Sequence, residues 1–396
     1  MSKSGWEETK LGDIARLVTA KSKPDAESRY IALEHINGEG SNSINGWASG
    51  SDYKSASVKF ENGDILFSKL RPYLNKVWQA EFDGFTTGEA LVYRAFPEKV
   101  TQDFLYLILR SHDAVKYADD RSIGTRMPRI APKIMAEFTV NVPPLDVQPE
   151  IVNFMQALDQ IIQAGDREIS SAQQMRVDIL NTLLRDNTQS WNSVKVKEVA
   201  QIVSGATPKT GRPECWGGNI PWVTPKDLSE NPSPYTSRGA RSITEEGFNS
   251  CSTHMLPKGA VLLTSRAPVG YVSVAENEIC TNQGFKSLIL NETQIPEFWY
   301  YLLSTNTETL LNYSGGSTFK ELSKTSLGEI KFLVPPLEEQ EKIVEKMQAL
   351  DAYLESAKRS QEALKQVRKD VLHALLSGDK DVREVAEMFT ADHAVA

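Results

Sequence analysis

The 396-residue sequence lacks the patterns that several classes of protein require. Its three cysteines, Cys215, Cys251 and Cys280, form no C-x-x-C pair, which excludes a disulfide scaffold and a cysteine-based zinc site. No apolar run approaches the roughly 20 residues of a membrane span, and the polar opening residues predict no secretory signal. We therefore expect a cytoplasmic protein in a reducing compartment.

Catalytic signatures are lacking as well. The segment that starts at Gly205, GATPKTGR, resembles a phosphate-binding loop but lacks the final Lys-Ser/Thr pair. None of the five histidines stands in an H-E-x-x-H motif, and there is no G-x-S-x-G elbow. Both Pro-Pro pairs follow valine and precede leucine, unlike the Asn/Asp-Pro-Pro-Tyr motif of amino-methyltransferases. These absences favour a protein that is not an enzyme over a self-contained methyltransferase.

The composition is that of a globular protein, with 40% hydrophobic and 24% charged residues in a length that suits two or three domains. The formal net charge of −8 argues against a nucleic-acid binder at first sight. However, residues 1–141 carry 19 basic and 19 acidic side chains, and residues 191–333 carry 13 of each. The acidic excess therefore lies in the remaining segments, and net charge does not exclude DNA binding.

The most informative feature is an internal duplication. Residues 142–159 read VPPLDVQPEIVNFMQALD, and residues 334–351 read VPPLEEQEKIVEKMQALD, at an offset of 192. Other segments match at offsets from 185 to 196, including FENGDILFSKLRP with LPKGAVLLTSRAP. Each half contains a mixed region of about 140 residues with strand-like runs, then a Pro-Pro pair, then a long proline-free stretch.

The two proline-free stretches carry apolar residues in a heptad-like register, which predicts long helices that need a partner. The register positions in the first stretch are Ile151, Leu158, Gly165, Ala172 and Ile179, and those in the second are Ile343, Leu350, Ala357, Leu364 and Val371. We expect the helices to pack as an antiparallel coiled coil with pseudo-two-fold symmetry. The alternative is two independent amphipathic helices, each docked on its own domain.

These observations predict an α+β fold built by tandem duplication of a mixed α/β domain plus a long helix; the family resemblance described below implies that each domain is a target-recognition domain and each long helix a spacer. The expected segments are a first domain at 1–144, a first spacer helix at 145–186, a second domain at 187–336, a second spacer helix at 337–378 and a tail at 379–396. In the tail, Arg383-Glu-Val-Ala-Glu-Met resembles Lys197-Glu-Val-Ala-Gln-Ile at a step of 186. If the tail begins a third repeat, Val385, Ala386 and Met388 should be buried.

Basic, polar and aromatic residues occupy loops at matching places in the two halves. Loops that carry such residues on a rigid scaffold suit contacts to phosphates and base edges. The candidate DNA-binding residues are Lys21, Lys23, Lys69, Arg71, Tyr73, Arg126, Arg129, Lys209, Arg212, Lys226, Arg266, Lys320 and Lys324. Each one alone is an ordinary surface residue, and the repeated placement carries the prediction.

Three segments of the second half complete a family pattern: SGATPKTGRPECWGGNIPWVTPKDL at 204–228, TNQGFKSL at 281–288 and GGSTFKELSKTSLGEIKFLVPPLEEQEKIV at 315–344. With the repeated P-P-L-x-x-Q junction, the chain closely resembles the specificity subunit of type I restriction–modification enzymes over nearly its whole length. The first half departs from the pattern at its opening, where Tyr30-Ile-Ala-Leu-Glu-His-Ile stands in place of IPWVTPKDL.

The resemblance implies a non-catalytic subunit in which each domain reads one half of a split, asymmetric DNA target. It also implies that the helix pair fixes the distance between half-sites and that two methyltransferase subunits and restriction/translocase subunits are partners. The expected cofactors, S-adenosylmethionine, ATP and magnesium, then belong to those partners, with none in this chain. The open alternatives are the recognition subunit of a related enzyme that cuts on both sides of its site and a coiled-coil scaffold that binds no DNA.

Overall fold

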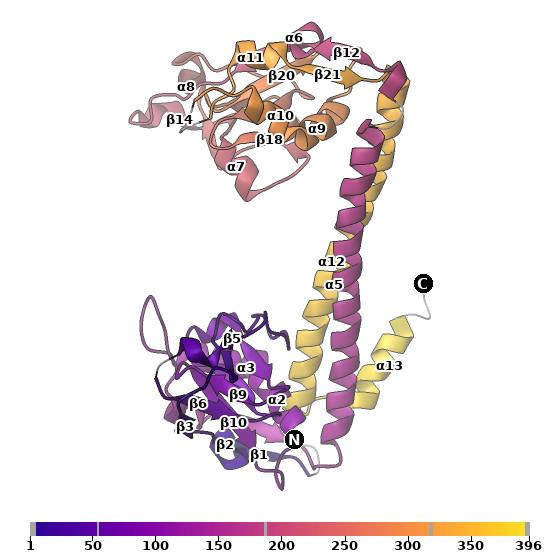
Figure 1. The fold of residues 1–396 in the computed structure, drawn as a ribbon. Helices are drawn as coiled ribbons and strands as arrows, with labels where there is room; N and C mark the ends of the chain where they lie inside the picture. The colour runs from indigo at the N-terminus through magenta and orange to yellow at the C-terminus, as the bar shows by residue number, and fades with distance from the viewer. Residues whose placement is uncertain (1–4, 54, 186–187, 317–319, 393–396) are drawn as a thin grey trace. The chain divides into compact units, whose positions relative to one another are not determined.

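The computed structural model describes residues 5–53, 55–185, 188–316 and 320–392 (Figure 1). The chain forms two compact units: unit 1 consists of Met1–Glu168 and Lys358–Ala396, and unit 2 consists of Ile169–Ala357. Each unit therefore holds one globular domain and one part of each of the two long helices. The expected segments follow chain order, whereas the compact units combine the start of one helix with the end of the other.

Unit 1 contains three sheets. A two-stranded sheet pairs β1 with β11, a four-stranded sheet has the order β2-β10-β7-β8, and a five-stranded sheet has the order β3-β6-β9-β4-β5. The strands are β1 Glu7–Lys10, β2 Ala15–Leu17, β3 Lys21–Ser22, β4 Arg29–Ile31, β5 Ala48–Ser49, β6 Ser57–Phe60, β7 Ile65–Ser68, β8 Val77–Gln79, β9 Gly84–Thr86, β10 Ala90–Ala95 and β11 Thr139–Val142.

Unit 2 repeats this plan with a few changes. A two-stranded sheet pairs β12 with β21, a five-stranded sheet has the order β13-β20-β17-β18-β15, and a three-stranded sheet has the order β16-β14-β19. The strands are β12 Asn192–Lys195, β13 Ala200–Ser204, β14 Trp216–Val223, β15 Tyr235–Thr236, β16 Arg241–Ile243, β17 Val261–Ser265, β18 Val269–Ala275, β19 Cys280–Thr281, β20 Lys286–Leu290 and β21 Lys331–Val334.

Helices cover these sheets and connect the domains. In unit 1 the short ones are α1 Leu11–Ile14, α2 Gln102–Arg110, α3 His112–Asp120 and α4 Pro132–Met135, with 3-10 turns η1 Gly50–Asp52 and η2 Pro72–Leu74. In unit 2 they are α6 Val196–Val199, α7 Pro225–Glu230, α8 Glu245–Asn249, α9 Pro296–Thr305, α10 Thr307–Asn312 and α11 Lys324–Glu329, with η3 Thr188–Ser190 and η4 Pro213–Cys215. The long helices are α5 Gln148–Arg185 and α12 Leu337–Ser377, and α13 Val382–Asp392 follows.

The long helices pack antiparallel within each unit (Figure 1). In unit 1, Arg368 of α12 donates to both carboxylate oxygens of Asp159 on α5. In unit 2, Arg176 of α5 donates in the same way to Asp351 of α12. The two ion pairs are related by the repeat offset of 192, so the packing is pseudo-symmetric. The expected pairing of the helices is confirmed, and the alternative of two independent helices is wrong.

The buried stripe of the helices differs in part from the heptad prediction. Ile151, Leu158 and Ile343 are buried, but Ile179 is 36% exposed and its neighbour Leu180 is buried. An α-helix has 3.6 residues per turn, so a strict seven-residue repeat drifts around its surface over several turns. The prediction for Ile179 is wrong for this reason.

The P-P-L-x-x-Q junction has a clear structural role. Gln148 and Gln340 end the motif in the two halves, and both side chains are fully buried. The Gln148 side chain accepts from the Thr101 backbone and donates to two backbone carbonyls, including that of Pro143. Gln340 bonds Ile295 and Pro335 in the same way. Gln148 thus connects the start of α5 to the start of α2, and Gln340 connects the start of α12 to the start of α9.

The tail agrees only in part with the expectation of a third repeat. Val385 is buried in the core of unit 1 and Ala386 is half-buried, while the side chain of Met388 lies outside the described residues. The matching segment of unit 2 is the four-residue helix α6 followed by a strand, whereas the tail continues as the longer helix α13. Gly378, with a φ of +76°, separates α12 from this helix.

Candidate nucleic-acid interface

A tight turn follows the equivalent strands β7 and β17, and its backbone is unusual in the same way in both units. Arg71 and Ala267 each precede a proline and have φ values of 49° and 54°. Side chains rarely adopt this left-handed conformation, and a following proline disfavours it further. Such strain persists only where the surrounding structure enforces it, and it is concentrated at functional sites. The two turns are therefore our first candidate for a recognition surface.

The loop before each long helix joins this turn to form one surface. The amide of Ile130 donates to Lys69 at 3.0 Å, and in unit 2 the amide of Leu322 donates to Ser265 at 2.9 Å. Each loop is closed by its own backbone bridge, Ile123 with Arg129 and Gly315 with Glu321. Because the same hydrogen bonds recur, the two units present the same pair of loops with different side chains.

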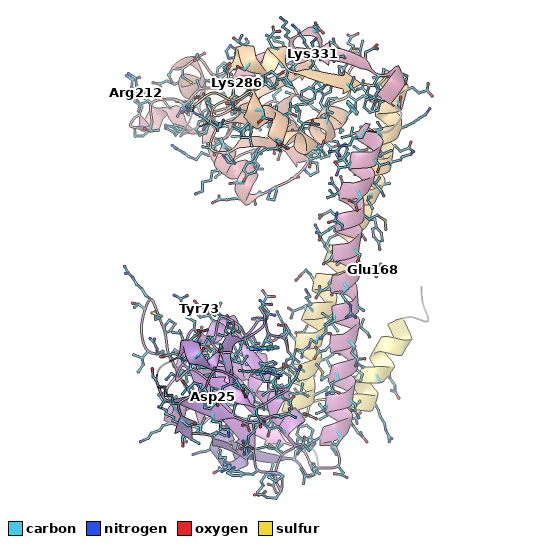
Figure 2. All side chains as sticks on the ribbon, in the orientation of Figure 1. Asp25, Tyr73, Glu168, Arg212, Lys286 and Lys331 are labelled. Carbon is cyan, nitrogen blue, oxygen red and sulfur yellow. The ribbon has the colours of Figure 1, made fainter. Side chains whose placement is uncertain are left out.

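In unit 1 this surface brings together five of the predicted residues. Arg71, Tyr73 and Arg126 are exposed, and the Arg71 guanidinium donates to the Arg126 carbonyl at 3.3 Å. Figure 2 labels Tyr73, whose side chain is 53% exposed. Lys69 is half-buried, and Arg129 donates to Glu89 at 2.9 Å. Arg129 thus stabilises the loop, and the exposed arginines and tyrosine remain available to a ligand.

Lys21 and Lys23 lie on a different sheet. Lys21 is on β3, and Lys23 follows it beside a shallow polar pocket that Arg29 and Lys59 also line. Both lysines are exposed. The same pocket is also lined by Asp25, Glu27 and Asp83, so this area carries both charges, and within the part of the chain that the structure describes no contact joins the two lysines to the turn at Arg71.

In unit 2 the predicted residues Lys209 and Arg212 project from a loop that is packed tightly at its base. A Cβ added to Gly205 would meet the carbonyl oxygen of Thr281 at 2.2 Å, so only glycine fits there. The Trp222 indole donates to the Ala206 carbonyl at 3.0 Å. The S-G-A-T-P and T-N-Q-G motifs are therefore a packed pair that holds the exposed Lys209 and Arg212 in place.

The remaining predicted residues of unit 2 fall into two groups. Arg266, half-buried, lies 3.8 Å from Glu321, which follows the exposed Lys320; the exposed Lys324 is the first residue of α11. Lys286, which the sequence analysis did not name, lies near Arg266 and Glu321, and burial lowers its pKa. Lys226 is instead on α7, where it forms an exposed ion pair with Glu230 one turn away.

Two arginine–aromatic stacks were missed by the sequence reasoning. Arg29 lies 4.9 Å from the ring centre of Trp47 and 4.5 Å from that of Phe82, and Trp47 is 53% exposed. In unit 2, Arg241 lies 3.4 Å from the ring centre of Trp216. Stacked arginine and exposed aromatic rings suit contacts to bases. No local sequence signal could reveal them, because the partners of each stack lie 18 or more residues apart in the sequence.

Within the described part of the chain, no group of three or more histidine, cysteine or acidic side chains could hold a metal ion. None of the described helices combines the length and the hydropathy needed to cross a bilayer. Strained turns, anchored loops and basic or aromatic side chains are the features that the two units share. They define a duplicated recognition protein with two related surfaces.

The family follows from comparison with known proteins. The chain matches the model described as type I restriction modification DNA specificity domain twice, over residues 3–185 and 188–366. It therefore belongs to this family and carries two copies of the domain. The resemblance, the tandem α+β fold and the assignment as a non-catalytic recognition subunit are confirmed.

Two relatives from Methanocaldococcus jannaschii illustrate the match. The type I restriction enzyme MjaIX specificity subunit is 44% identical over 181 residues, which cover 45% of this chain and 42% of that protein. The putative type I restriction enzyme MjaX specificity subunit is 23% identical over 410 residues, which cover 94% of this chain and 93% of that protein. The first match thus spans less than half of its relative, and the second spans nearly all of it.

Solved structures show the same fold. A chain from a study of complex assembly and conformational transition of the type I R-M system has a TM-score of 0.72 at 21% identity, covering 94% of this chain and 98% of that one. The HsdS subunit from Thermoanaerobacter tengcongensis has a TM-score of 0.55 at 21% identity, covering 96% and 98%.

Proposed function

We propose that this chain reads a split, asymmetric DNA target, with one half-site for each unit. The observation that carries the proposal is the matched pair of anchored loops, at Lys69–Tyr73 with Ile123–Arg129 and at Ser265–Pro268 with the described residues 315–316 and 320–324. Both pairs sit on a scaffold of the DNA-specificity family. Since the loops share backbone hydrogen bonds but differ in side chains, the two half-sites should differ in sequence.

The long helices act in this proposal as a spacer that sets the number of unread base pairs between half-sites. Two methyltransferase subunits and the restriction/translocase subunits assemble with the chain and supply the chemistry. S-adenosylmethionine, ATP and magnesium are then ligands of those partners, and the complex works in the cytoplasm on double-stranded DNA. The packed ion pairs of the helices support a stiff spacer.

Binding to duplex DNA tests the proposal. The substitutions Lys320→Ala and Lys324→Ala together should weaken binding to all duplexes about equally and reduce the slope of log K against log salt by about 2, because each lost phosphate contact removes roughly 0.9 from it. Fluorescence anisotropy of the full chain, assembled with its methyltransferase subunits, on labelled duplexes from low to moderate salt measures both quantities.

Lys331→Ala is the matched control, since this exposed lysine lies on β21 and outside the recognition loops (Figure 2). It should leave affinity and slope unchanged. Binding that does not depend on salt, or equal effects of the control and the loop variant, would instead favour the protein scaffold that binds no DNA.

A further inference from the structure

Unit 2 contains a pocket that lies away from the recognition loops, between α9, α12 and the strand β15. Its volume is about 220 Å³. Three tyrosines line it, Tyr235, Tyr300 and Tyr301, together with the carboxylates of Glu297 and Asp351. None of the described lining residues is a lysine or an arginine. Aromatic walls combined with carboxylates attract cations, because ring faces and carboxylate oxygens both carry negative charge.

The polar groups of the pocket are held in fixed positions. The Tyr235 hydroxyl donates to Glu297 at 3.1 Å and accepts from the Gln348 amide at 3.0 Å. The Tyr301 hydroxyl donates to Asp351 at 2.8 Å. Burial, and then the negative charge of Glu297, raise the pKa of Tyr235. The pocket is therefore preorganised. Arg176 pairs with Asp351 and lies 5.8 Å from the ring centre of Tyr301, so the net negative charge of the pocket comes from Glu297.

The duplicated unit shows what this scaffold accommodates. Gln148 bonds the amide of Thr101 and Gln340 bonds that of Ile295, so α2 and α9 align at an offset of 194. At this offset, Ser304 of α9 is the residue of unit 2 equivalent to Arg110 of α2. In unit 1 the buried Arg110 guanidinium lies 2.7 Å from Asp159 and 5.0 Å from the ring centre of Tyr106. The same elements in unit 1 thus hold a guanidinium between a tyrosine and an aspartate.

The alignment also shows a difference of one charge. At the equivalent positions, unit 1 has the carboxylates of Asp103 and Asp159 and the guanidinium groups of Arg110 and Arg368. Unit 2 also has two carboxylates at these positions, Glu297 and Asp351. It has one guanidinium, that of Arg176, because Ser304 stands where unit 1 has Arg110. The pocket of unit 2 thus lacks the second cation that balances the charge in unit 1.

We propose that this pocket binds an alkyl guanidinium or alkylammonium cation. The methylene groups of such a ligand would contact the tyrosine rings, and its charged end would reach Glu297. Two sources share this chemistry: a free polyamine, and an arginine or lysine side chain of a partner subunit. The proposal rests on unit 2 alone and does not depend on DNA recognition.

Agmatine is the probe, because it carries a guanidinium and an ammonium on a four-carbon chain. Isothermal titration of the full chain without DNA should show saturable binding at one site. Glu297→Gln should weaken this binding at least fivefold, since it removes the charge while keeping the side-chain size. Glu308→Gln is the matched control on the neighbouring helix α10, exposed and outside the pocket, and should change affinity less than twofold.

Ser304→Arg is a second, independent variant that introduces the arginine of unit 1. Its guanidinium should occupy the space beside Tyr300 and Asp351 and reduce agmatine binding at least fivefold. Because Ser304 is exposed, the change should not unfold the domain. Absence of saturable binding, or equal weakening by Glu297→Gln and Glu308→Gln, would overturn the proposal.

A further titration distinguishes the sources of the cation. If the ligand is a partner side chain, assembly with the methyltransferase subunits should abolish agmatine binding. A photo-crosslinker at Gln348 should then capture a peptide that contains arginine or lysine. If the ligand is a free polyamine, spermidine should bind the assembled complex as well as the isolated chain. Each result supports the pocket as a cation site and identifies a different occupant.

Discussion

Two buried glutamines show how much a single residue contributes at the junction between domain and helix. Gln340 accepts a hydrogen bond from the amide of Ile295 and donates one to the carbonyl of Pro335. Gln340→Ala should therefore lower the free energy of unfolding of unit 2 by about 2 to 4 kcal/mol, because buried backbone groups lose their partners. Urea unfolding, followed by hydrogen exchange of the segment around α9, measures the loss.

The control for this prediction is Gln173→Ala, an exposed glutamine on α5 in the same unit. Its effect should stay within about 0.5 kcal/mol. A similarly small effect of Gln340→Ala would show that the motif is retained for another reason than anchoring.

The ion pair of Asp159 predicts how acid affects unit 1. Burial acts to raise the pKa of this carboxyl, but the hydrogen bond from Arg368 and the charge of Arg110 outweigh it, so the pKa lies below its ordinary value. The pair therefore stabilises unit 1 above the unfolded pKa of about 3.9, and this stability is lost as the pH falls through the folded value. Asp159→Asn should cost on the order of 3 kcal/mol at pH 7, since it leaves two guanidinium groups without a counter-charge.

The test is urea unfolding at pH 7 and at pH 3, where the difference between the wild type and Asp159→Asn should be smaller than at pH 7, because the carboxyl of the unfolded chain is already mostly protonated at pH 3. Asp370→Asn is the control, because Asp370 is exposed on α12 and accepts a hydrogen bond from Gln366 that an asparagine can also accept. If the difference between wild type and Asp159→Asn stayed constant down to pH 3, the carboxylate charge would not be what stabilises this site.

At this scale the sequence could predict exposed residues better than buried ones. The repeated P-P-L-x-x-Q motif identified Gln148 and Gln340, but not their hydrogen bonds to Thr101 and Ile295, because these two partners lie more than 40 residues away. Asp159 and Arg368 are 209 residues apart, and nothing in the local sequence marks them as partners. The basic residues at the turn of Arg71 could be predicted, since they follow a strand and repeat in the other half.

At the scale of elements, the register of the helices allows a sharper test of the spacer. Asp159 lies opposite Arg368 and Arg176 opposite Asp351, so each step forward along α5 matches one step back along α12. The junction after Arg167 then faces the junction after Arg359. Four residues inserted at both junctions lengthen each helix by about 6 Å and leave the existing pairs in register. We predict a DNA target with unchanged half-sites and a spacer longer by about one or two base pairs of 3.4 Å.

Methylome sequencing of a host that expresses the variant with its methyltransferase subunit measures the spacer. An insertion after Arg167 alone is the control, because it shifts one helix against the other and breaks the pairing of Arg176 with Asp351. It should reduce methylation rather than move the half-sites apart. An unchanged spacer with both insertions would contradict the proposed role of the helices.

The helices were also the elements that the sequence predicted best. Prolines at 143–144 and 335–336 and an apolar repeat set their bounds, and α12 begins at Leu337 as expected. The first helix begins at Gln148, three residues later than expected, because a turn follows Pro144. The tail could not be predicted as well: six matching residues suggested a copy of α6 and its strand, but tertiary packing on Trp6 and the core of unit 1 favours a longer helix.

At the scale of the whole molecule, each unit has its own hydrophobic core. Unit 1 buries Phe104 and Trp78 in its clusters, and unit 2 buries Trp299 and Phe285 in separate ones. A duplicated protein of this kind can change the loops of one unit while the core of the other is unaffected. This separation explains why the two halves keep their junctions and differ in their loops.

The separate cores predict that recognition by the two units is additive. Arg71→Gln in unit 1 and Arg212→Gln in unit 2 should each weaken binding to the cognate duplex, by about 1 to 3 kcal/mol where the arginine contacts a base edge. Because the two side chains share no partner or core cluster, the double variant should lose the sum of the two effects within about 0.5 kcal/mol.

Arg71→Gln combined with Arg126→Gln is the matched comparison, since these residues share one surface and a hydrogen bond. That pair should deviate from additivity by more than 0.5 kcal/mol. Anisotropy titrations at one salt concentration supply all the affinities. A coupling of more than 1 kcal/mol between Arg71 and Arg212 would show that the two half-sites are read jointly, through the helices or through a deformation of the DNA.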